Sequence, residues 1–242
     1  VMQHVGYARS PYTNVVTAGA EVVGFRTVAE ALATLVERLR AQRGPAYYQL
    51  YIDTVDSVSH IHGPDSPQTD AEIDTVLSAI DRLLHPALAA LGRPATLLLT
   101  ADHGQIAIAP ERAHLVDRLV PDLLDATPTG ADDRPLLPGG SRRDLFLFLK
   151  PERVDAIRAA LAEALAGRAE VHRCLDLVDA GLFGPDPSAT FHARLGDLAV
   201  LPYAGETVWW SDKRFPVRFR GSHGGLSPEE AHTQLAALQY AP

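Results

Sequence analysis

Short apolar runs that alternate with an amphipathic segment constrain the fold of this chain more than any other feature. Residues 47–52 and 95–99 are rich in aromatic, leucine and β-branched residues, which is typical of buried strands. Between them, apolar residues recur at helical spacing over residues 73–84. A strand, a helix and a strand in this order form a right-handed crossover, so the two strands are expected to run parallel. The pattern therefore predicts an α/β domain.

Capping signals and apolar periodicity place the remaining elements. Residues 27–30 form a capping box at the start of one helix, residues 69–72 form a second box before the helix described above, and Pro86 is expected to end or kink that helix. We expect residues 1–26 to be irregular or partly stranded and residues 53–68 to form a loop. Further expected elements are helices near 114–124, 154–165 and 175–181, strands near 145–149, 170–174, 198–201 and 207–210, and a helix after a third box at 227–230.

The composition fits one ordinary globular domain. The chain has 242 residues, of which 46% are hydrophobic and 21% are charged, so a sizeable core is possible. Its net charge of −8 argues against a general binder of nucleic-acid polymers, because such proteins need a basic surface. The single cysteine, Cys174, excludes an intrachain disulfide and a zinc site built from several cysteines. We expect residues 1–242 to form a single domain, with a small subdomain inserted at about residues 105–200.

Aspartate and histidine residues follow the two predicted strands directly. Asp56 and His60 come after the first strand, and their spacing of four places both on one side of a helical turn. Asp102 and His103 come after the second strand, and ligands of open parallel sheets bind beyond the carboxyl ends of the strands. We therefore expect these two pairs to lie near one another. His223 lies beside two glycines, just ahead of the predicted C-terminal helix.

This mixture of imidazoles and carboxylates suits Zn²⁺, or Mn²⁺ where oxygen ligands dominate. Five ligands exceed the usual three or four of one zinc ion and indicate two ions. Two ions about 3.5–4 Å apart form the arrangement used for in-line displacement at phosphorus. Each motif also has an ordinary interpretation, since Asp-x-x-x-His is common, Asp-His-Gly occurs in turns and a histidine beside glycines occurs in loops. The combination is what favours a metal site.

Three motifs in this order carry a resemblance to a known family. The sequence YIDTVDSVSHIHGP at residues 51–64 resembles the Asp…His-x-x-Gly-Pro motif of the type I phosphodiesterase/nucleotide pyrophosphatase family. The sequence TADHG at residues 100–104 resembles the second Asp-His motif of that family, and GSHGGLSPEE at residues 221–230 resembles the closing His-Gly-Gly motif of bacterial members. The resemblance runs from about residue 47 to residue 230, and the motifs are far more specific together than singly.

The resemblance implies a fold, a metal content and a set of ligands. The family belongs to the alkaline phosphatase superfamily. This implies a three-layer α/β/α core, here incomplete at the N-terminus and with a small inserted α+β subdomain, and usually two zinc ions. Carried over by motif, Asp56, His60 and His223 would hold one ion, while Asp102 and His103 would help to hold the other. Two divalent ions are expected, most simply Zn²⁺, with Mn²⁺ as the alternative.

The resemblance also implies groups that are not matched in this chain. The family uses a Thr or Ser nucleophile at a helix N-terminus and a further Asp ligand, both from an N-terminal segment. Ser10, Thr13 and Thr17 are hydroxyl residues near the start, but none lies in the family's pattern. We therefore expect the chain to be the C-terminal part of a longer enzyme, whose nucleophile lies upstream of Val1.

The function favoured by these residues is metal-dependent hydrolysis of phosphate esters. The leading hypothesis is a phosphodiesterase or nucleotide pyrophosphatase acting on a small-molecule phosphate ester or nucleotide. One alternative is a phosphomonoesterase or phosphomutase of the same superfamily, because cofactor-independent phosphoglycerate mutases have a similar Thr-Ala-Asp-His-Gly motif. Another is a truncated, non-catalytic domain that binds metal. No apolar run approaches the length of a membrane span, and no export signal is visible. Because such a signal could precede Val1, localisation is left open, with the cytoplasm slightly favoured.

Four residues near these motifs are given simpler roles. Asp53 either orients a metal ligand or caps a loop. Arg142 and Arg143 are expected in a solvated loop, in preference to contact with an anionic substrate. Cys174 lies in an apolar stretch and is expected to be an inert core residue.

Overall fold

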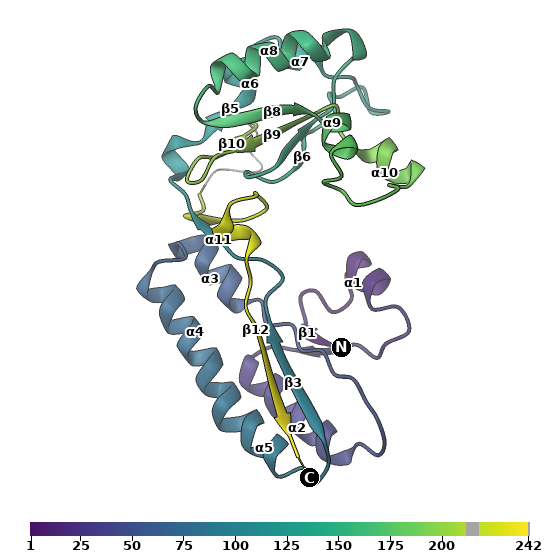
Figure 1. Cartoon of the computed structure of the whole chain (residues 1–242), viewed down its shortest axis with the longest axis vertical. Helices are drawn as coiled ribbons and strands as arrows, with labels where there is room; N and C mark the ends of the chain where they lie inside the picture. Colours follow the sequence, from purple (N-terminus) through teal and green to yellow (C-terminus); the bar gives the residue numbers. More distant parts are fainter. Residues whose placement is uncertain (212–217, 242) are drawn as a thin grey trace. The chain divides into compact units, whose positions relative to one another are not determined.

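The computed structural model describes residues 1–211 and 218–241 and divides into two compact units. Unit 1 consists of Val1–Ala101 and the residues from Gln234 onward, and unit 2 consists of Asp102–Thr233 (Figure 1). The expected single domain with an insertion at about residues 105–200 stays a prediction. Within the described residues, no helix combines the length and the apolar character needed to cross a bilayer.

Unit 1 is a mixed α/β body whose strands pair in two groups. Its elements are β1 (Met2–His4), α1 (Pro11–Val16), β2 (Val23–Phe25), α2 (Val28–Ala41), α3 (Thr54–His62), α4 (Pro67–Ala79), the π-helical turn η1 (Ile80–Leu84), α5 (His85–Ala89), β3 (Ala95–Thr100) and β12 (Leu235–Tyr240). Strands β1 and β2 run parallel, and β12 pairs with β3 in antiparallel register from Leu235 opposite Thr100 to Tyr240 opposite Ala95.

The core of unit 1 forms around helix α2. Ala31, Leu32 and Leu35 on one face of this helix are buried, as the periodicity predicts. They belong to a cluster that also contains Met2, Phe25, Leu84, Leu88 and Tyr240. The capping box is confirmed, because the Thr27 hydroxyl oxygen accepts a hydrogen bond from the Glu30 N–H at 3.1 Å.

The strand prediction in unit 1 is partly wrong. Residues 47–52 do not form a strand: Tyr47 is 83% exposed, and Leu50 makes a single parallel bridge to Met2. Strand β3 is present, but its partner is β12, and the pair is antiparallel. The C-terminal strand was missed because its pairing with β3 joins segments about 140 residues apart, which local periodicity cannot detect.

The loop predicted over residues 53–68 is also wrong, because α3 occupies most of it. The following helix α4 begins earlier than expected. The Ser66 side chain accepts from the Thr69 N–H at 3.2 Å, and Pro67 occupies the first turn, where a helix has no use for its missing N–H. At Pro86 the helical path is not ended but continues through the π-helical turn η1 into α5.

Unit 2 contains a four-stranded antiparallel sheet in the order β6-β7-β9-β8. Its elements are β4 (Ile106–Ala107), η2 (Pro110–Arg112), β5 (His114–Leu115), α6 (Val116–Leu119), α7 (Leu123–Ala126), β6 (Gly139–Gly140), β7 (Leu145–Leu147), η3 (Pro151–Arg153), α8 (Val154–Ala164), β8 (Ala169–Arg173), α9 (Cys174–Asp179), α10 (Ala189–Arg194), β9 (Leu198–Pro202), β10 (Val208–Trp209), β11 (Gly221–Ser222) and α11 (Pro228–Ala231). Most of the elements expected between residues 145 and 210 are confirmed. The single helix expected near 114–124 is wrong: Pro121 separates α6 from α7.

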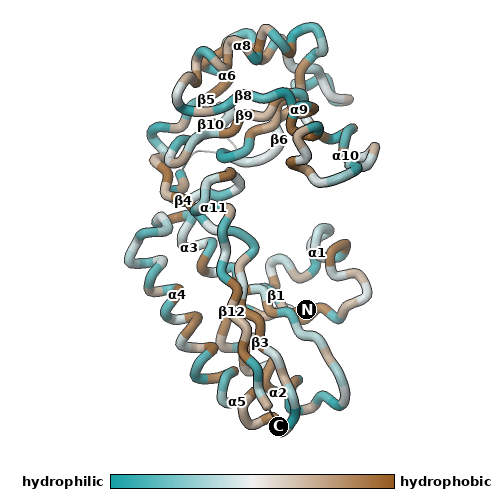
Figure 2. Tube along the Cα trace, viewed as in Figure 1, coloured by the Kyte–Doolittle hydropathy of each residue, from teal (hydrophilic) through white to brown (hydrophobic). Residues whose placement is uncertain are grey.

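Helix α8 covers one face of this sheet (Figure 1). Its residues Ile157 and Leu161 are buried in a cluster with Leu145, Leu147 and Val200 of the sheet. Figure 2 shows the corresponding alternation of apolar and polar segments along α8. Cys174 is fully buried, so its predicted place in the core is confirmed. Burial raises the pKa of its thiol to about 12, which is consistent with the predicted lack of reactivity.

Candidate functional site

Helix α3 presents a carboxylate and an imidazole side by side. Asp56 and His60 are one turn apart, and the distance from Asp56 Oδ1 to His60 Nε2 is 3.4 Å. Both side chains are partly exposed. Because the spacing of four aligns side chains on one helical face, this arrangement follows from the local sequence once the segment is helical.

Asp53 lies directly before α3 and makes no capping hydrogen bond through its side chain. Its partner is instead Tyr7, whose hydroxyl is hydrogen-bonded to the Asp53 carboxylate. The negative charge of Asp53 is the main cause that raises the pKa of Tyr7, with burial, the hydrogen bond and the charge of Asp56 adding to it. Two carboxylates therefore give the start of α3 a negative potential, which favours a cation there.

Unit 2 brings two distant histidines together. His103 follows β3 by three residues, and His223 follows β11. Their rings are stacked with centroids 3.6 Å apart and planes inclined by 12°, and each ring offers a nitrogen within 4.8 Å of the other. The carboxylate of Asp102 is exposed and lies 3.7 Å from His103 Nε2. Two imidazoles and a carboxylate are groups of the kind that can coordinate a divalent metal ion.

Short backbone contacts hold the two histidine segments beside each other. Strand β11 pairs antiparallel with β4, so that Ser222 lies opposite Ile106. Gly104, next to His103, donates its N–H to the Glu230 carbonyl at 2.8 Å. A Cβ at Gly104 would lie only 2.0 Å from the carbonyl oxygen of Glu229, so the glycine of the Asp-His-Gly motif is required by this close approach.

The solvated loop predicted for Arg142 and Arg143 is wrong. Arg143 is 1% exposed, and its Nε and Nη2 donate to the two carboxylate oxygens of Glu230 at 2.9 and 2.7 Å. Arg142 is also buried, and its guanidinium lies 5.0 Å from the Phe219 ring centroid and 5.5 Å from that of Trp209. Sequence reasoning missed both because the groups that cover them come from segments at least 60 residues away.

The third capping box has a different role from the one predicted. Helix α11 has only four residues, and Ser227 makes no capping hydrogen bond through its side chain. The Ser227 hydroxyl instead donates to the Glu230 carboxylate at 2.8 Å, and the Gly225 N–H donates to the same carboxylate at 3.0 Å. The Glu230 position was therefore visible in the motif, but its buried partner Arg143 was not.

Acid is expected to destabilise unit 2 through Glu230. Burial by itself would raise the pKa of this carboxyl, but hydrogen bonds from Arg143 and Ser227 more than offset burial and lower the pKa below its usual 4.5. The charged form therefore stabilises the fold above pH 4.5, and this stabilisation is lost as the pH falls through the lowered pKa of the folded state. Tryptophan fluorescence reports on unit 2, which contains Trp209 and Trp210, and should show the free energy of unfolding declining over this range.

The Glu230→Gln variant should lose this component of the pH dependence, because glutamine does not titrate. An equally steep decline in the variant would contradict the assignment of the acid sensitivity to Glu230.

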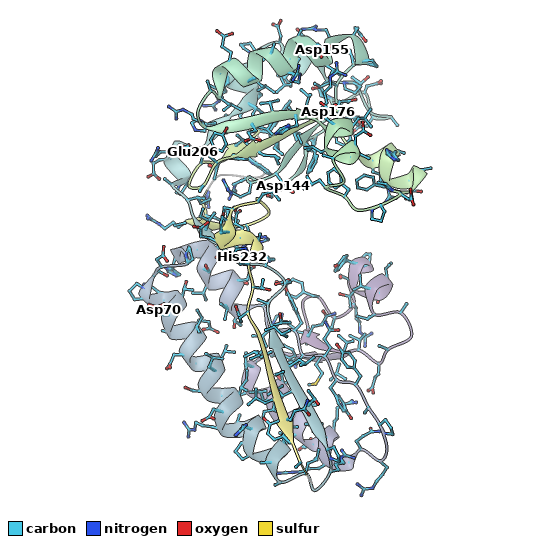
Figure 3. All side chains as sticks on the ribbon, viewed as in Figure 1. Asp70, Asp144, Asp155, Asp176, Glu206 and His232 are labelled. Carbon is cyan, nitrogen blue, oxygen red and sulfur yellow. The ribbon has the colours of Figure 1, made fainter. Side chains whose placement is uncertain are left out.

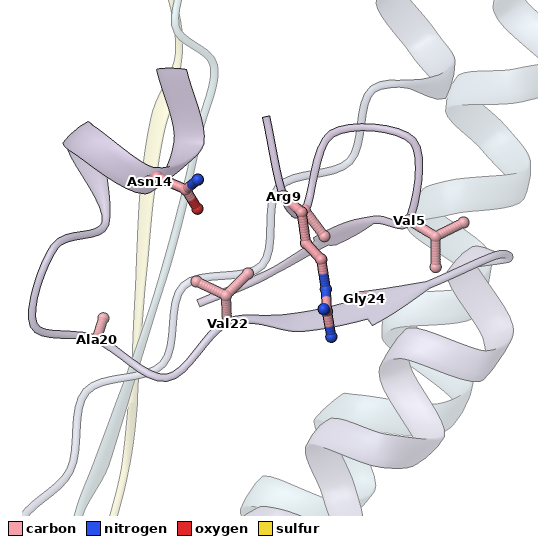
Figure 4. Close-up of a pocket in the computed structure, with 7 residues that line it drawn as sticks. Val5, Arg9, Asn14, Ala20, Val22 and Gly24 are labelled. Atoms are coloured by element: carbon pink, nitrogen blue, oxygen red, sulfur yellow. The ribbon is translucent and has the colours of Figure 1, made fainter. Parts of the chain in front are cut away.

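A surface pocket of about 780 Å³ lies elsewhere in unit 1 (Figure 4). Its lining includes Arg9, Asn14 and Val22, with small and apolar residues around them. None of the metal ligands predicted from the sequence lines it. A single arginine among small and apolar groups does not define a catalytic centre. We therefore do not assign the active site to this pocket.

Comparisons with known proteins place the chain in a family. The type I phosphodiesterase/nucleotide pyrophosphatase family matches residues 4–226. No curated protein matches the chain in sequence. Among solved structures, human ectonucleotide pyrophosphatase/phosphodiesterase 5 is 18% identical with a TM-score of 0.67, covering 100% of this chain and 60% of its own. An inactive variant of the murine protein in complex with AMP is 17% identical with a TM-score of 0.65. This match covers 91% of the present chain and 55% of the murine chain.

A further structural neighbour has a different named activity. Phosphonoacetate hydrolase from Sinorhizobium meliloti is 20% identical with a TM-score of 0.60, covering 87% of this chain and 49% of its own. These likenesses confirm the expected α/β fold, and the chain spans about 60% of the length of the first of them. On the strength of the match over residues 4–226, the chain belongs to the type I phosphodiesterase/nucleotide pyrophosphatase family.

Proposed function

We propose that the whole protein is a metal-dependent phosphodiesterase or nucleotide pyrophosphatase that uses two divalent ions. The observation that carries this proposal is the stacked pair His103 and His223, which comes from two family motifs more than 100 residues apart. Family membership supplies the reaction class. The complex of the murine neighbour with AMP supports a nucleotide as the substrate class.

Five residues are proposed as the metal ligands in this chain. Asp56, His60 and His223 would hold one ion, and Asp102 and His103 would help to hold the other. The donor chemistry fits Zn²⁺, with Mn²⁺ as the alternative, because each pair combines a carboxylate with an imidazole at 3.4 or 3.7 Å. When bound, such ions stabilise negative charge on the attacking and leaving oxygens of a phosphate ester.

The nucleophile is proposed to come from another part of the whole protein. The hydroxyls near the start of this chain already have structural roles: Ser10 caps α1, Thr13 donates to the Tyr7 carbonyl at 2.8 Å, and Thr17 donates to the Thr13 carbonyl at 2.7 Å. Thr13 is also buried. A Thr or Ser outside this chain would attack phosphorus and displace the alcohol or phosphate leaving group, and water would then hydrolyse the covalent phospho-enzyme to release the second product.

The experiment that tests this proposal compares two substrates on the whole protein. We expect turnover of bis(p-nitrophenyl) phosphate to exceed turnover of p-nitrophenyl phosphate by about tenfold or more, because the site would be shaped around a diester. A chelator should abolish both activities, and added Zn²⁺ or Mn²⁺ should restore them. A preference for the monoester would support the phosphomonoesterase alternative, and no turnover with zinc restored would support a non-catalytic domain.

A further inference from the structure

We propose that the buried Arg143–Glu230 ion pair is a positioning device that sets the spacing of the two imidazoles of His103 and His223. This inference rests on the proposed metal-dependent function, because its consequence is a metal site assembled with the correct distance between ligands. Glu230 connects to one histidine segment through its side chain and to the other through its backbone.

The side chain of Glu230 holds the segment that carries His223. It accepts the Gly225 N–H at 3.0 Å and the Ser227 hydroxyl at 2.8 Å, in addition to its two bonds from Arg143. A Cβ at Gly225 would lie 2.6 Å from Glu230 Oε2 and 2.9 Å from Arg143 Nη2. The loop therefore lies directly on the ion pair, and a side chain at Gly225 would have to displace the ends of Glu230 and Arg143.

A second polar pair supports the same loop from Gly224. Gly224 has φ of +107°, and a Cβ there would lie 2.7 Å from the Ser141 hydroxyl oxygen and 3.1 Å from Asp144 Oδ1. The Ser141 hydroxyl lies at 3.2 Å from the His223 carbonyl oxygen and is also hydrogen-bonded to Asp144, which Figure 3 labels. Gly224 and Gly225 thus allow the backbone beside His223 to pack against the Ser141–Asp144 and Arg143–Glu230 pairs. This packing restricts the movement of that backbone.

The backbone of Glu230 holds the segment that carries His103. Its carbonyl accepts the Gly104 N–H at 2.8 Å, one residue after His103. Glu230 thus contacts both histidine segments. It binds Gly225, two residues after His223, and Gly104, one residue after His103. A shift of Glu230 would change the separation of the two rings, whose centroids are 3.6 Å apart.

Arg143 connects this assembly to the body of unit 2. Its Nη1 donates to the backbone carbonyls of Tyr203 and Glu206, in the segment between β9 and β10. Its Nε and Nη2 donate to the two oxygens of the Glu230 carboxylate. This bidentate geometry fixes both the distance and the orientation of the carboxylate relative to the guanidinium. Both side chains are 1% exposed, so solvent does not loosen the pair.

The test measures metal affinity in the whole protein with Zn²⁺ and Mn²⁺ as the probes. Glu230→Gln keeps the shape of the side chain but removes the charge that orients Arg143, and we expect metal to bind about 10–100-fold more weakly. Ser227→Ala removes one donor without leaving a buried charge unpaired, so it should fold and weaken binding by a smaller factor. Glu229→Gln is the matched control, because it makes the same change at an exposed neighbour and should leave affinity unchanged.

A second readout needs no metal. In the metal-free protein labelled with ¹⁵N-histidine, the ring signals of His103 and His223 should move in Glu230→Gln and Ser227→Ala and stay in place in Glu229→Gln. Signals and affinities equal to those of the control in both variants would overturn the positioning role. Absence of metal binding by the wild-type protein would instead overturn the proposed function, and the ring signals would still decide the role of Glu230.

Discussion

Replacing His60 with alanine in the whole protein is expected to lower phosphodiester hydrolysis by about 10³-fold, because several kcal/mol of charge stabilisation in the transition state depend on the bound ions. His60 and Asp56 present adjacent donor atoms on α3, so removal of the imidazole leaves the carboxylate without its neighbouring ligand. Metal analysis of the purified variant should show a reduced zinc or manganese content. The same loss is expected for His103→Ala and His223→Ala.

The control for this prediction lies on the same helix. His62 is exposed on α3 two residues after His60, and its alanine variant should keep both metal content and activity. An unchanged metal stoichiometry in His60→Ala, His103→Ala and His223→Ala would reject the ligand assignment.

Replacing Arg143 with alanine is expected to lower the free energy of unfolding of unit 2 by about 3–5 kcal/mol, since it leaves the Glu230 carboxylate buried without its counter-charge. The loss also removes hydrogen bonds to the Tyr203 and Glu206 carbonyls. Urea denaturation followed by tryptophan fluorescence measures this change, because both tryptophans, Trp209 and Trp210, lie in unit 2.

An exposed ion pair provides the comparison. Arg38 bonds Glu21 in unit 1 with two contacts of 2.8 Å, but solvent reaches both side chains. Screening by water makes such pairs weak, so Arg38→Ala should hardly change stability when unfolding is followed by circular dichroism. Equal effects of Arg38→Ala and Arg143→Ala would contradict the importance assigned to burial.

Local signals in the sequence predicted those elements that depend on near neighbours. The helix after Thr27, the strand at β7, helix α8 and the pair β8–α9 have periodicity and caps that operate within a few residues. The spacing of Asp56 and His60 likewise predicts that both lie on one turn, although the sequence pattern of this segment predicts a loop. That error arose because six of the nine residues of α3 are polar, which is typical of a loop.

Contacts between distant segments were beyond the reach of the same reasoning. Strand β12 was missed because its stability comes from β3, and a local reading does not show this partner. The sequence predicts a solvated position for Arg143, because two adjacent arginines shortly after Pro-Gly-Gly are typical of an exposed turn. Only the contacts of residues 203–206 and of Glu230 with Arg143 make this turn an interior site.

The amino-acid sequence by itself determined the family and the α/β class, and it supplied the candidate metal ligands, because these depend on residue types and short spacings. Tertiary structure alone decided that His103 stacks on His223 and that a buried arginine–glutamate pair lies beside their loops. The physical reason is that ring stacking and the burial of an ion pair occur only when segments distant in the sequence pack together and exclude water. No short stretch of the chain contains both partners.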